Sequence, residues 1–241
     1  MTLSQIGVLF EDENLIVLDK PSGLLTLPDR WDHNVANLQT LLREKYGEIF
    51  VVHRLDRDTS GVIVFAKDAE SHRKLSIAFE ERSVSKRYLA LVTGVPRADS
   101  GTIDLAIDEN PGKPGTMRIS KKGKECLTEY TVAEKFRDYA LVEVTLHTGR
   151  THQIRVHFQG IGHPLAVDPV YGGQESLLLS KIKRGYRFPE WENERPLLSR
   201  VPLHSWKLEF PHPATGETIR CEAPLPKDMK AVLFQLRKLV K

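Results

Sequence analysis

Residues 49–66 read IFVVHRLDRDTSGVIVFA, and this stretch decides where the sequence places its polar chemistry. Its two ends, residues 49–52 and 62–66, are runs of β-branched and aromatic residues that predict two buried strands. Between them, residues 53–61 hold two arginines, two aspartates and a histidine. A short polar loop held by rigid strands is a common setting for catalytic groups. We therefore expect the functional site to include this loop.

Asp56 is the residue of this loop that most needs a partner. It follows the first strand, where a partly buried carboxylate requires a cation nearby. Residues 149–157, GRTHQIRVH, offer one. They predict a helix over residues 151–159 that Thr151 caps, with Arg155 four residues further along the same face. We expect the Arg155 guanidinium to face the Asp56 carboxylate in a cleft.

The remaining segments predict an α+β protein. Strands are expected over residues 15–18, 86–93, 129–136, 141–146 and 203–210. Helices are expected over residues 37–46, 68–82 and 226–240, the second with Asp68 as its N-cap, and residues 174–200 around Trp191 read as a charged loop. Strands outnumber helices and alternate with them irregularly. This order favours a mixed, mainly antiparallel sheet with flanking helices and a central cleft.

The composition is that of an ordinary globular protein. The chain has 241 residues, of which 40% are hydrophobic and 28% charged, which suits one large domain or two small ones. Its two cysteines exclude a disulfide scaffold or a cysteine-rich zinc module. The apolar runs are too short to cross a bilayer, and no signal peptide is visible at the N-terminus. A cytoplasmic location without membrane association is expected.

The net charge of +3 says little by itself, but the basic residues cluster. Two stretches, residues 113–124 and 181–187, contain several lysines and arginines and no acidic residue. They are Lys113, Arg118, Lys121, Lys122, Lys124 in the first and Lys181, Lys183, Arg184, Arg187 in the second. Two interpretations are open at this point: a phosphate-binding face, or two solvated loops.

Two other kinds of site are disfavoured. A zinc site would need converging histidines, but His152 and His157 are five residues apart and so point about 140° apart on a helix. A hydrolase triad built on Ser60 is disfavoured because the chain has no Gly-x-Ser-x-Gly turn. We therefore expect no metal.

Several stretches together resemble the RluA-type RNA pseudouridine synthases. Residues 53–61, HRLDRDTSG, resemble that family's HRLDxxTSG signature, which is highly specific. Other stretches are similar to further motifs of the family, in the same order along the chain: residues 20–24, 86–94, 149–157, 163–172 and 203–216. The similarity covers nearly the whole chain.

The resemblance implies a role for individual residues. Asp56 matches the essential aspartate, Arg155 the cation paired with it, and Tyr88 the tyrosine that stacks under the target base or moves a proton. Arg54 matches the arginine that displaces the target base and takes its place in the RNA. From the same segments, His53 and Arg150 are expected to bind substrate.

The sequence also departs from the family pattern. Val167 stands where the family usually has glycine, and a β-branched residue resists a positive φ. Ser205 stands in place of the usual alanine, and no N-terminal RNA-binding module of the kind that many members carry precedes residue 10. We accordingly expect a single catalytic domain over residues 1–241.

The implied activity is the isomerisation of uridine to pseudouridine in structured RNA, either ribosomal RNA or transfer RNA. The reaction exchanges an N1–C1′ bond for a C5–C1′ bond without net oxidation, so neither a cofactor nor a metal is expected. RNA is the expected partner, and the protein is expected to be a monomer. A non-catalytic protein that binds or folds RNA is the alternative. A base-excising glycosidase is less favoured, since Asp56 lacks a second carboxylate to activate water.

Overall fold

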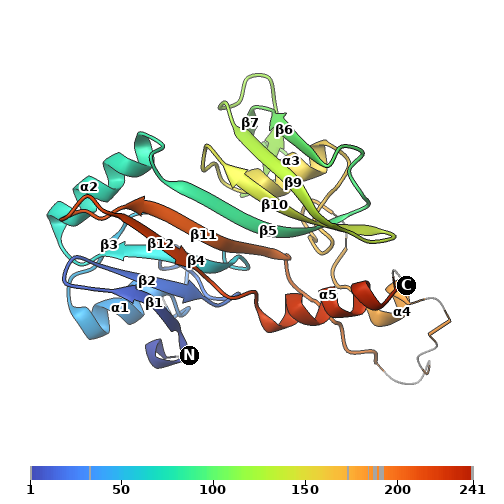
Figure 1. The fold of residues 1–241 in the computed structure, drawn as a ribbon, viewed down its shortest axis with the longest axis horizontal. Coiled ribbons are helices and arrows are strands. Elements are labelled where there is room, and N and C mark those ends of the chain that lie inside the picture. The colour runs from blue at the N-terminus through green and yellow to red at the C-terminus, as the bar shows by residue number, and fades with distance from the viewer. Residues whose placement is uncertain are drawn as a thin grey trace. The chain divides into compact units, whose positions relative to one another are not determined.

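The computed structural model describes residues 2–32, 34–172, 174–183, 185–186, 189 and 193–239. The chain divides into two compact units (Figure 1). Unit 1 comprises residues 1–88 and 204–224, and unit 2 comprises residues 89–203 and 225–241. The expectation of one catalytic domain over the whole chain stays a prediction.

Unit 1 is a sheet with two helices. Its elements are η1 (Leu3–Gln5), β1 (Gly7–Glu11), β2 (Leu15–Lys20), α1 (Leu38–Tyr46), β3 (Phe50–Val51), β4 (Ser60–Ala66), α2 (Ala69–Glu80), β11 (Leu203–Pro211) and β12 (Thr218–Glu222). Strand β4 pairs antiparallel with β2 and β3, while β2 pairs with β1 and β11 with β12 in the same sense. The pairing of β4 with β11 is parallel, with His204 opposite Ser60 and Ser205 opposite Gly61.

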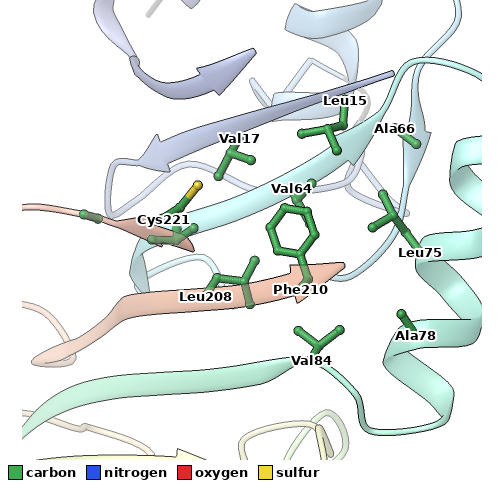
Figure 2. Close-up of a cluster of buried hydrophobic side chains, with 12 residues drawn as sticks. Leu15, Val17, Val64, Ala66, Leu75, Ala78, Val84, Leu208, Phe210 and Cys221 are labelled. Atoms are coloured by element: carbon green, nitrogen blue, oxygen red, sulfur yellow. The ribbon is translucent and has the colours of Figure 1, made fainter. Parts of the chain in front are cut away.

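The core of unit 1 forms where β4, β11 and α2 meet. Every residue of β4 is buried, as expected for a continuous apolar strand covered on both faces. Figure 2 shows Phe210 and Leu208 of β11 close to Val64 of β4, with Leu75 and Ala78 facing them from α2. The helix begins as predicted, because the side chain of Asp68 accepts a hydrogen bond from the backbone N–H of Ser71.

Unit 2 contains the second part of β5 (Ser85–Thr93), which runs from one unit into the other. Its further elements are β6 (Ser100–Asp104), β7 (Ile107–Glu109), β8 (Met117–Ile119), β9 (Leu127–Lys135), β10 (Tyr139–Leu146), α3 (Gln153–Gly160), α4 (Leu179–Ile182) and α5 (Lys227–Leu239). Strand β9 pairs antiparallel with both β10 and β6, and β7 and β8 form a separate hairpin. One face of α5 contributes Val232, Leu233 and Leu236 to the core of this unit.

The fold class is confirmed as α+β with mainly antiparallel pairing. The predicted strand over 62–66 starts earlier, at Ser60, whereas the strand over 49–52 is reduced to Phe50–Val51. The short strands β1, β6, β7, β8 and β12 were not predicted, because few of them show a clear apolar alternation. The central cleft stays a prediction.

Two sequence predictions concern the second basic stretch and the C-terminal region. Residues 174–200 were predicted as a loop, but they include the short helix α4. Trp191, Arg184, Arg187 and Val240 lie outside the described residues.

Among the residues that the structure does describe, no helix has the length and apolar character needed to span a membrane.

Gly61 allows β4 and β11 to approach each other closely. Its φ is +108°, and a Cβ at this position would collide with the backbone carbonyl of Ser205. We expect Gly61→Ala to lower the free energy of unfolding by about 3 kcal/mol or more, measured by chemical denaturation. Gly47→Ala is the matched control: φ there is +78° and ψ is −111°, so alanine carries backbone strain of about 1–3 kcal/mol, but its Cβ would meet no atom beyond the neighbouring residues within 4 Å. Equal losses would contradict this assignment.

Candidate active site

The polar loop between β3 and β4 alternates between buried and exposed residues. Leu55 is buried, Arg54 is exposed and Asp56 is partly buried. The backbone N–H of Thr59 donates to the carbonyl of Asp56 and closes a turn. The loop is thus anchored by Leu55, while Arg54 is available to solvent and Asp56 lies at the boundary between protein and solvent.

The segment of residues 20–26 fixes the backbone of this loop on both sides of Asp56. The hydroxyl of Thr26 donates to the carbonyl of Leu55 at 2.9 Å and accepts from its N–H at 3.2 Å. On the other side, the hydroxyl of Ser22 donates to the carbonyl of Asp58, and the N–H of Gly23 donates to that of Arg57. The Asp56 backbone is therefore held by hydrogen bonds before and after it.

Lys20 is the centre of this arrangement. Its side chain is fully buried, and its Nζ donates to the carbonyls of Pro21, Leu24 and Arg57 at 3.0, 2.6 and 3.0 Å. A buried ammonium needs such acceptors, because an unsatisfied one would be very costly. Lys20 thus joins the 20–26 segment to the polar loop. In the sequence, Lys20 belongs to the stretch 20–24 that resembles a family motif, but no role for this lysine was predicted.

Tyr88 lies close enough to Asp56 for the two groups to interact. Burial, and to a smaller extent the charge of Asp56, raises the pKa of Tyr88 to about 12, although a hydrogen bond with the Ser205 side chain acts in the opposite direction. Ser205 is itself buried, and its hydroxyl donates to the carbonyl of Val62 at 3.0 Å. Tyr88 therefore keeps its proton at neutral pH beside the predicted catalytic carboxylate.

His53 is engaged within unit 1. Its Nε2 accepts the N–H of Val64 at 3.2 Å, and its ring stacks on Phe79 with centroids 4.8 Å apart. Removal from water, and secondly the charge of Lys86, lowers the pKa of His53 to about 3. The ring is neutral at physiological pH. These contacts favour a positioning role, and substrate binding by His53 stays a prediction.

Ser60 has a partner that the sequence did not reveal. Its hydroxyl lies 3.0 Å from Nδ1 of His204, and both residues are buried inside paired strands. Nε2 of His204 lies 3.3 Å from the carbonyl of Ala223, to which it can only donate, so Nδ1 accepts the Ser60 proton. This buried Ser–His pair joins the paired strands β4 and β11. The predicted polar loop over residues 53–61 is therefore shorter, because Ser60 already begins β4.

In unit 2, the 149–157 segment is fixed by a buried glutamine. The side-chain oxygen of Gln153 accepts from the hydroxyl of Thr148 and the N–H of Arg150, and its amide donates to Leu127 and Thr128 of β9. The predicted N-cap, Thr151, is wrong: α3 begins at Gln153, after His152 in a left-handed conformation with φ of 56°. Thr151 and Arg155 therefore do not share a helix.

Arg155 projects from α3 and is largely buried. Its Nε and Nη2 donate to the two carboxylate oxygens of Asp168 at 2.7 and 2.9 Å, which is a strong bidentate geometry. The guanidinium also lies over the ring of Tyr171 at 4.9 Å. Asp168 was not predicted to be this partner. Asp56 and Arg155 belong to different units, so their pairing stays a prediction.

The loop that holds Asp168 accommodates Val167 without strain. Within the described residues, only Arg82 and His152 have a positive φ among non-glycine residues, and Val167 is fully buried. Asp168 also accepts the N–H groups of Val170 and Tyr171. The departure from glycine at residue 167 thus leaves the carboxylate that orients Arg155 in place.

Arg150 is exposed and lines a cleft of about 480 Å³ in unit 2. The hairpin of β7 and β8 provides one wall, and Lys124, from the first basic stretch, is also part of the lining. Asp108 and Glu109 line it too, so the cleft is not uniformly basic. Binding of RNA by Arg150 and by the stretch 113–124 stays a prediction.

The histidines that invited a metal site have protein partners instead. His152 contacts the hydroxyl of Tyr171 at 2.8 Å, and Nε2 of His157 donates to the carbonyl of Leu105 at 2.8 Å. Over the described part of the chain, no group of three or more histidine, cysteine or carboxylate side chains is arranged to hold a metal ion.

Comparison with known proteins identifies the class of protein to which this fold belongs. The family model of RNA pseudouridylate synthases matches residues 14–160, which include Lys20, Asp56, Tyr88 and Arg155. The chain therefore belongs to the RNA pseudouridylate synthase family.

Curated relatives and solved structures agree with this assignment. The chain is 40% identical over 239 residues to the ribosomal large subunit pseudouridine synthase D of Nitrosomonas europaea, and 38% identical over 244 residues to that of Pseudomonas aeruginosa. Each alignment covers 97% of this chain but only 66% and 72% of the respective relative. The structure of human RNA pseudouridylate synthase domain containing 4 matches 98% of this chain and 94% of its own, with a TM-score of 0.72 and 26% identity.

We expect Thr26→Val to lower the turnover number in addition to the free energy of unfolding. Valine has the shape of threonine but leaves the N–H and carbonyl of Leu55 without their partner, which costs about 1–3 kcal/mol and releases the backbone next to Asp56. Turnover number and denaturation midpoint should be measured together. Ser71→Ala, which removes another buried hydroxyl from the N-terminus of α2, is the control and should lower stability alone. Equal turnover in the two variants would refute the positioning role of Thr26.

Tyr88 should make stability depend on alkaline pH. Because its pKa is raised from 10.0 to about 12, the folded state holds the proton more tightly than the unfolded chain. This contribution is fully present below pH 10 and is lost as the pH rises towards 12. Between pH 9 and 11 the wild type should therefore lose about 1 kcal/mol more unfolding free energy than Tyr88→Phe. Parallel pH profiles in chemical denaturation would contradict the raised pKa.

Proposed function

We propose that this protein converts uridine to pseudouridine in RNA of the large ribosomal subunit, with Asp56 as the catalytic carboxylate. The observation that carries the proposal is that hydrogen bonds from Thr26 and Lys20 fix the backbone on both sides of Asp56 in a member of the RNA pseudouridylate synthase family. The names of the curated relatives support ribosomal RNA as the substrate. Transfer RNA, a monomeric state and a cytoplasmic location stay predictions.

The reaction needs a group that acts at the ribose of a uridine turned out of its RNA. Turning it out costs a few kcal/mol, which contacts of basic residues with phosphates offset. Asp56 then either attacks C1′, forming an ester as the N1–C1′ bond breaks, or removes the C2′ proton to give a glycal. In both routes C1′ joins C5 of the rotated uracil, Asp56 is regenerated, C5 loses its proton and N1 gains one.

Tyr88 and Arg155 assist this step in different ways. The ring of Tyr88 offers an aromatic face against which the freed uracil stacks, so that the base does not leave the site. Its hydroxyl remains protonated and is oriented by Ser205. Arg155, oriented by Asp168, is assigned to hold the Asp56 carboxylate ionised, and Arg54, exposed beside Asp56, to occupy the space that the turned-out base leaves.

We expect Asp56→Asn to lower turnover by about a thousandfold or more while RNA binding survives. The substitution keeps the size of the side chain but removes its nucleophilic and basic oxygen. Tritium release from RNA that carries 5-tritiated uridine measures turnover, because only substitution at C5 frees that label, and a filter assay measures binding.

Asp58→Asn is the matched control, since it removes a carboxylate from the same loop and should lower turnover by less than about tenfold. Near-normal tritium release by Asp56→Asn would exclude Asp56 as the catalytic group. Wild-type protein that binds RNA without releasing tritium would favour an RNA-binding protein, and release of free uracil would favour a glycosidase.

A further inference from the structure

Trp31 is the most exposed large hydrophobic residue among those described. Its exposed fraction is 93%, whereas the next, Phe234, reaches 54%. Single exposed apolar residues are common on protein surfaces. A whole indole ring in solvent is more unusual, and it provides two flat faces without a packing partner. Such a ring is the kind of group on which an unpaired base stacks.

The loop that carries Trp31 starts from the segment that positions Asp56. The described residues of this loop, 27–32 and 34–36, are followed by its closed base, where Leu25 forms a bridge with Asn37 and the N–H of Gln39 donates to the carbonyl of Thr26. Thr26 is also the residue that holds Leu55, next to Asp56. The base of the Trp31 loop is therefore hydrogen-bonded to the polar loop that contains Asp56.

The tip of this loop is ordered by its own hydrogen bonds. One carboxylate oxygen of Asp29 accepts the N–H of Trp31 at 2.9 Å and that of Asp32 at 3.1 Å, which is a typical Asx turn. The backbone of Trp31 is therefore fixed although its side chain is exposed. A preorganised aromatic residue loses little conformational freedom when it binds a ligand.

The charges around Trp31 distinguish a base from a phosphate as its ligand. The tip contains Asp29, Arg30 and Asp32, so carboxylates outnumber the single guanidinium and a phosphate would gain little there. A nucleobase is uncharged and stacks on indole whatever its identity. The local chemistry thus fits an aromatic ring rather than the RNA backbone.

We propose that Trp31 stacks on an unpaired base of the substrate RNA close to the target uridine. The inference rests on the proposed function. Trp31 follows Thr26 by five positions in the chain, so their Cα atoms are at most about 18 Å apart. The contacted base therefore belongs to the nucleotides that flank the target uridine. Trp31 is a binding residue, not a catalytic one.

The test compares Trp31→Ala and Trp31→Phe with the wild type on large-subunit ribosomal RNA isolated from cells that lack this gene. Tritium release gives kcat and KM, and binding is measured over a range of salt concentrations. We expect Trp31→Ala to raise KM by about 5- to 150-fold with kcat unchanged and the same dependence of binding on salt. Trp31→Phe should recover most of the affinity, because phenylalanine retains an aromatic face.

Phe234→Ala is the matched control, since it removes another exposed aromatic ring, on α5, and should leave KM unchanged. A second measurement is independent of turnover. RNA should quench the tryptophan emission of the wild type, and Trp31→Phe should abolish most of this quenching although two other tryptophans remain.

The outcomes separate this inference from the proposed function. A wild-type KM in Trp31→Ala and wild-type quenching in Trp31→Phe, alongside normal tritium release, would overturn the stacking role and leave the function intact. A smaller salt dependence in Trp31→Ala would also overturn it, because it would indicate a phosphate contact. If the wild type released no tritium, the proposed function would fail, and quenching would still decide whether Trp31 meets a base.

Discussion

The buried ammonium of Lys20 is the interaction on which the geometry around Asp56 depends. An ammonium without access to water must be surrounded by acceptors, and the three carbonyls that surround Lys20 come from two segments far apart in the sequence. Because one of them belongs to Arg57, the position of the residue after Asp56 is fixed by a residue of β2. Catalytic groups are effective when supporting residues hold them within a fraction of an ångström, and Lys20 provides such support.

A second constraint comes from the contact between β4 and β11. Gly61 brings the two backbones so close that no side chain fits between them, and the parallel register then places Ser205 beside Gly61. From there the Ser205 hydroxyl reaches both the carbonyl of Val62 and the side chain of Tyr88. Gly61 therefore acts on the site indirectly, because it determines the position of Ser205, the hydrogen-bond partner of Tyr88.

Sequence patterns predicted the features that depend on local chemistry. The strand after the loop, the helix capped by Asp68 and the fold class follow from apolar spacing and capping residues, and the polar loop was singled out because its charges interrupt two apolar runs. The partners of site residues could not be predicted in the same way. Asp168 binds Arg155 from a loop 13 residues further along the chain, and Ser205 reaches Tyr88 from a distant strand, and no periodicity encodes such contacts.

One short stretch of chain contains both a segment that fixes the backbone next to Asp56 and an exposed aromatic side chain. Residues 20–26 hold the polar loop in place through hydrogen bonds. The residues that follow them carry the exposed indole ring of Trp31, on a tip whose backbone is ordered by Asp29. An enzyme that acts on a base turned out of its RNA needs both properties. The chemistry at C1′ requires a carboxylate that does not move, whereas recognition of an RNA requires groups that reach beyond the reacting nucleotide. Because Thr26 bonds to Leu55 and also closes the base of the Trp31 loop, the same backbone segment supports the Asp56 carboxylate and the exposed ring.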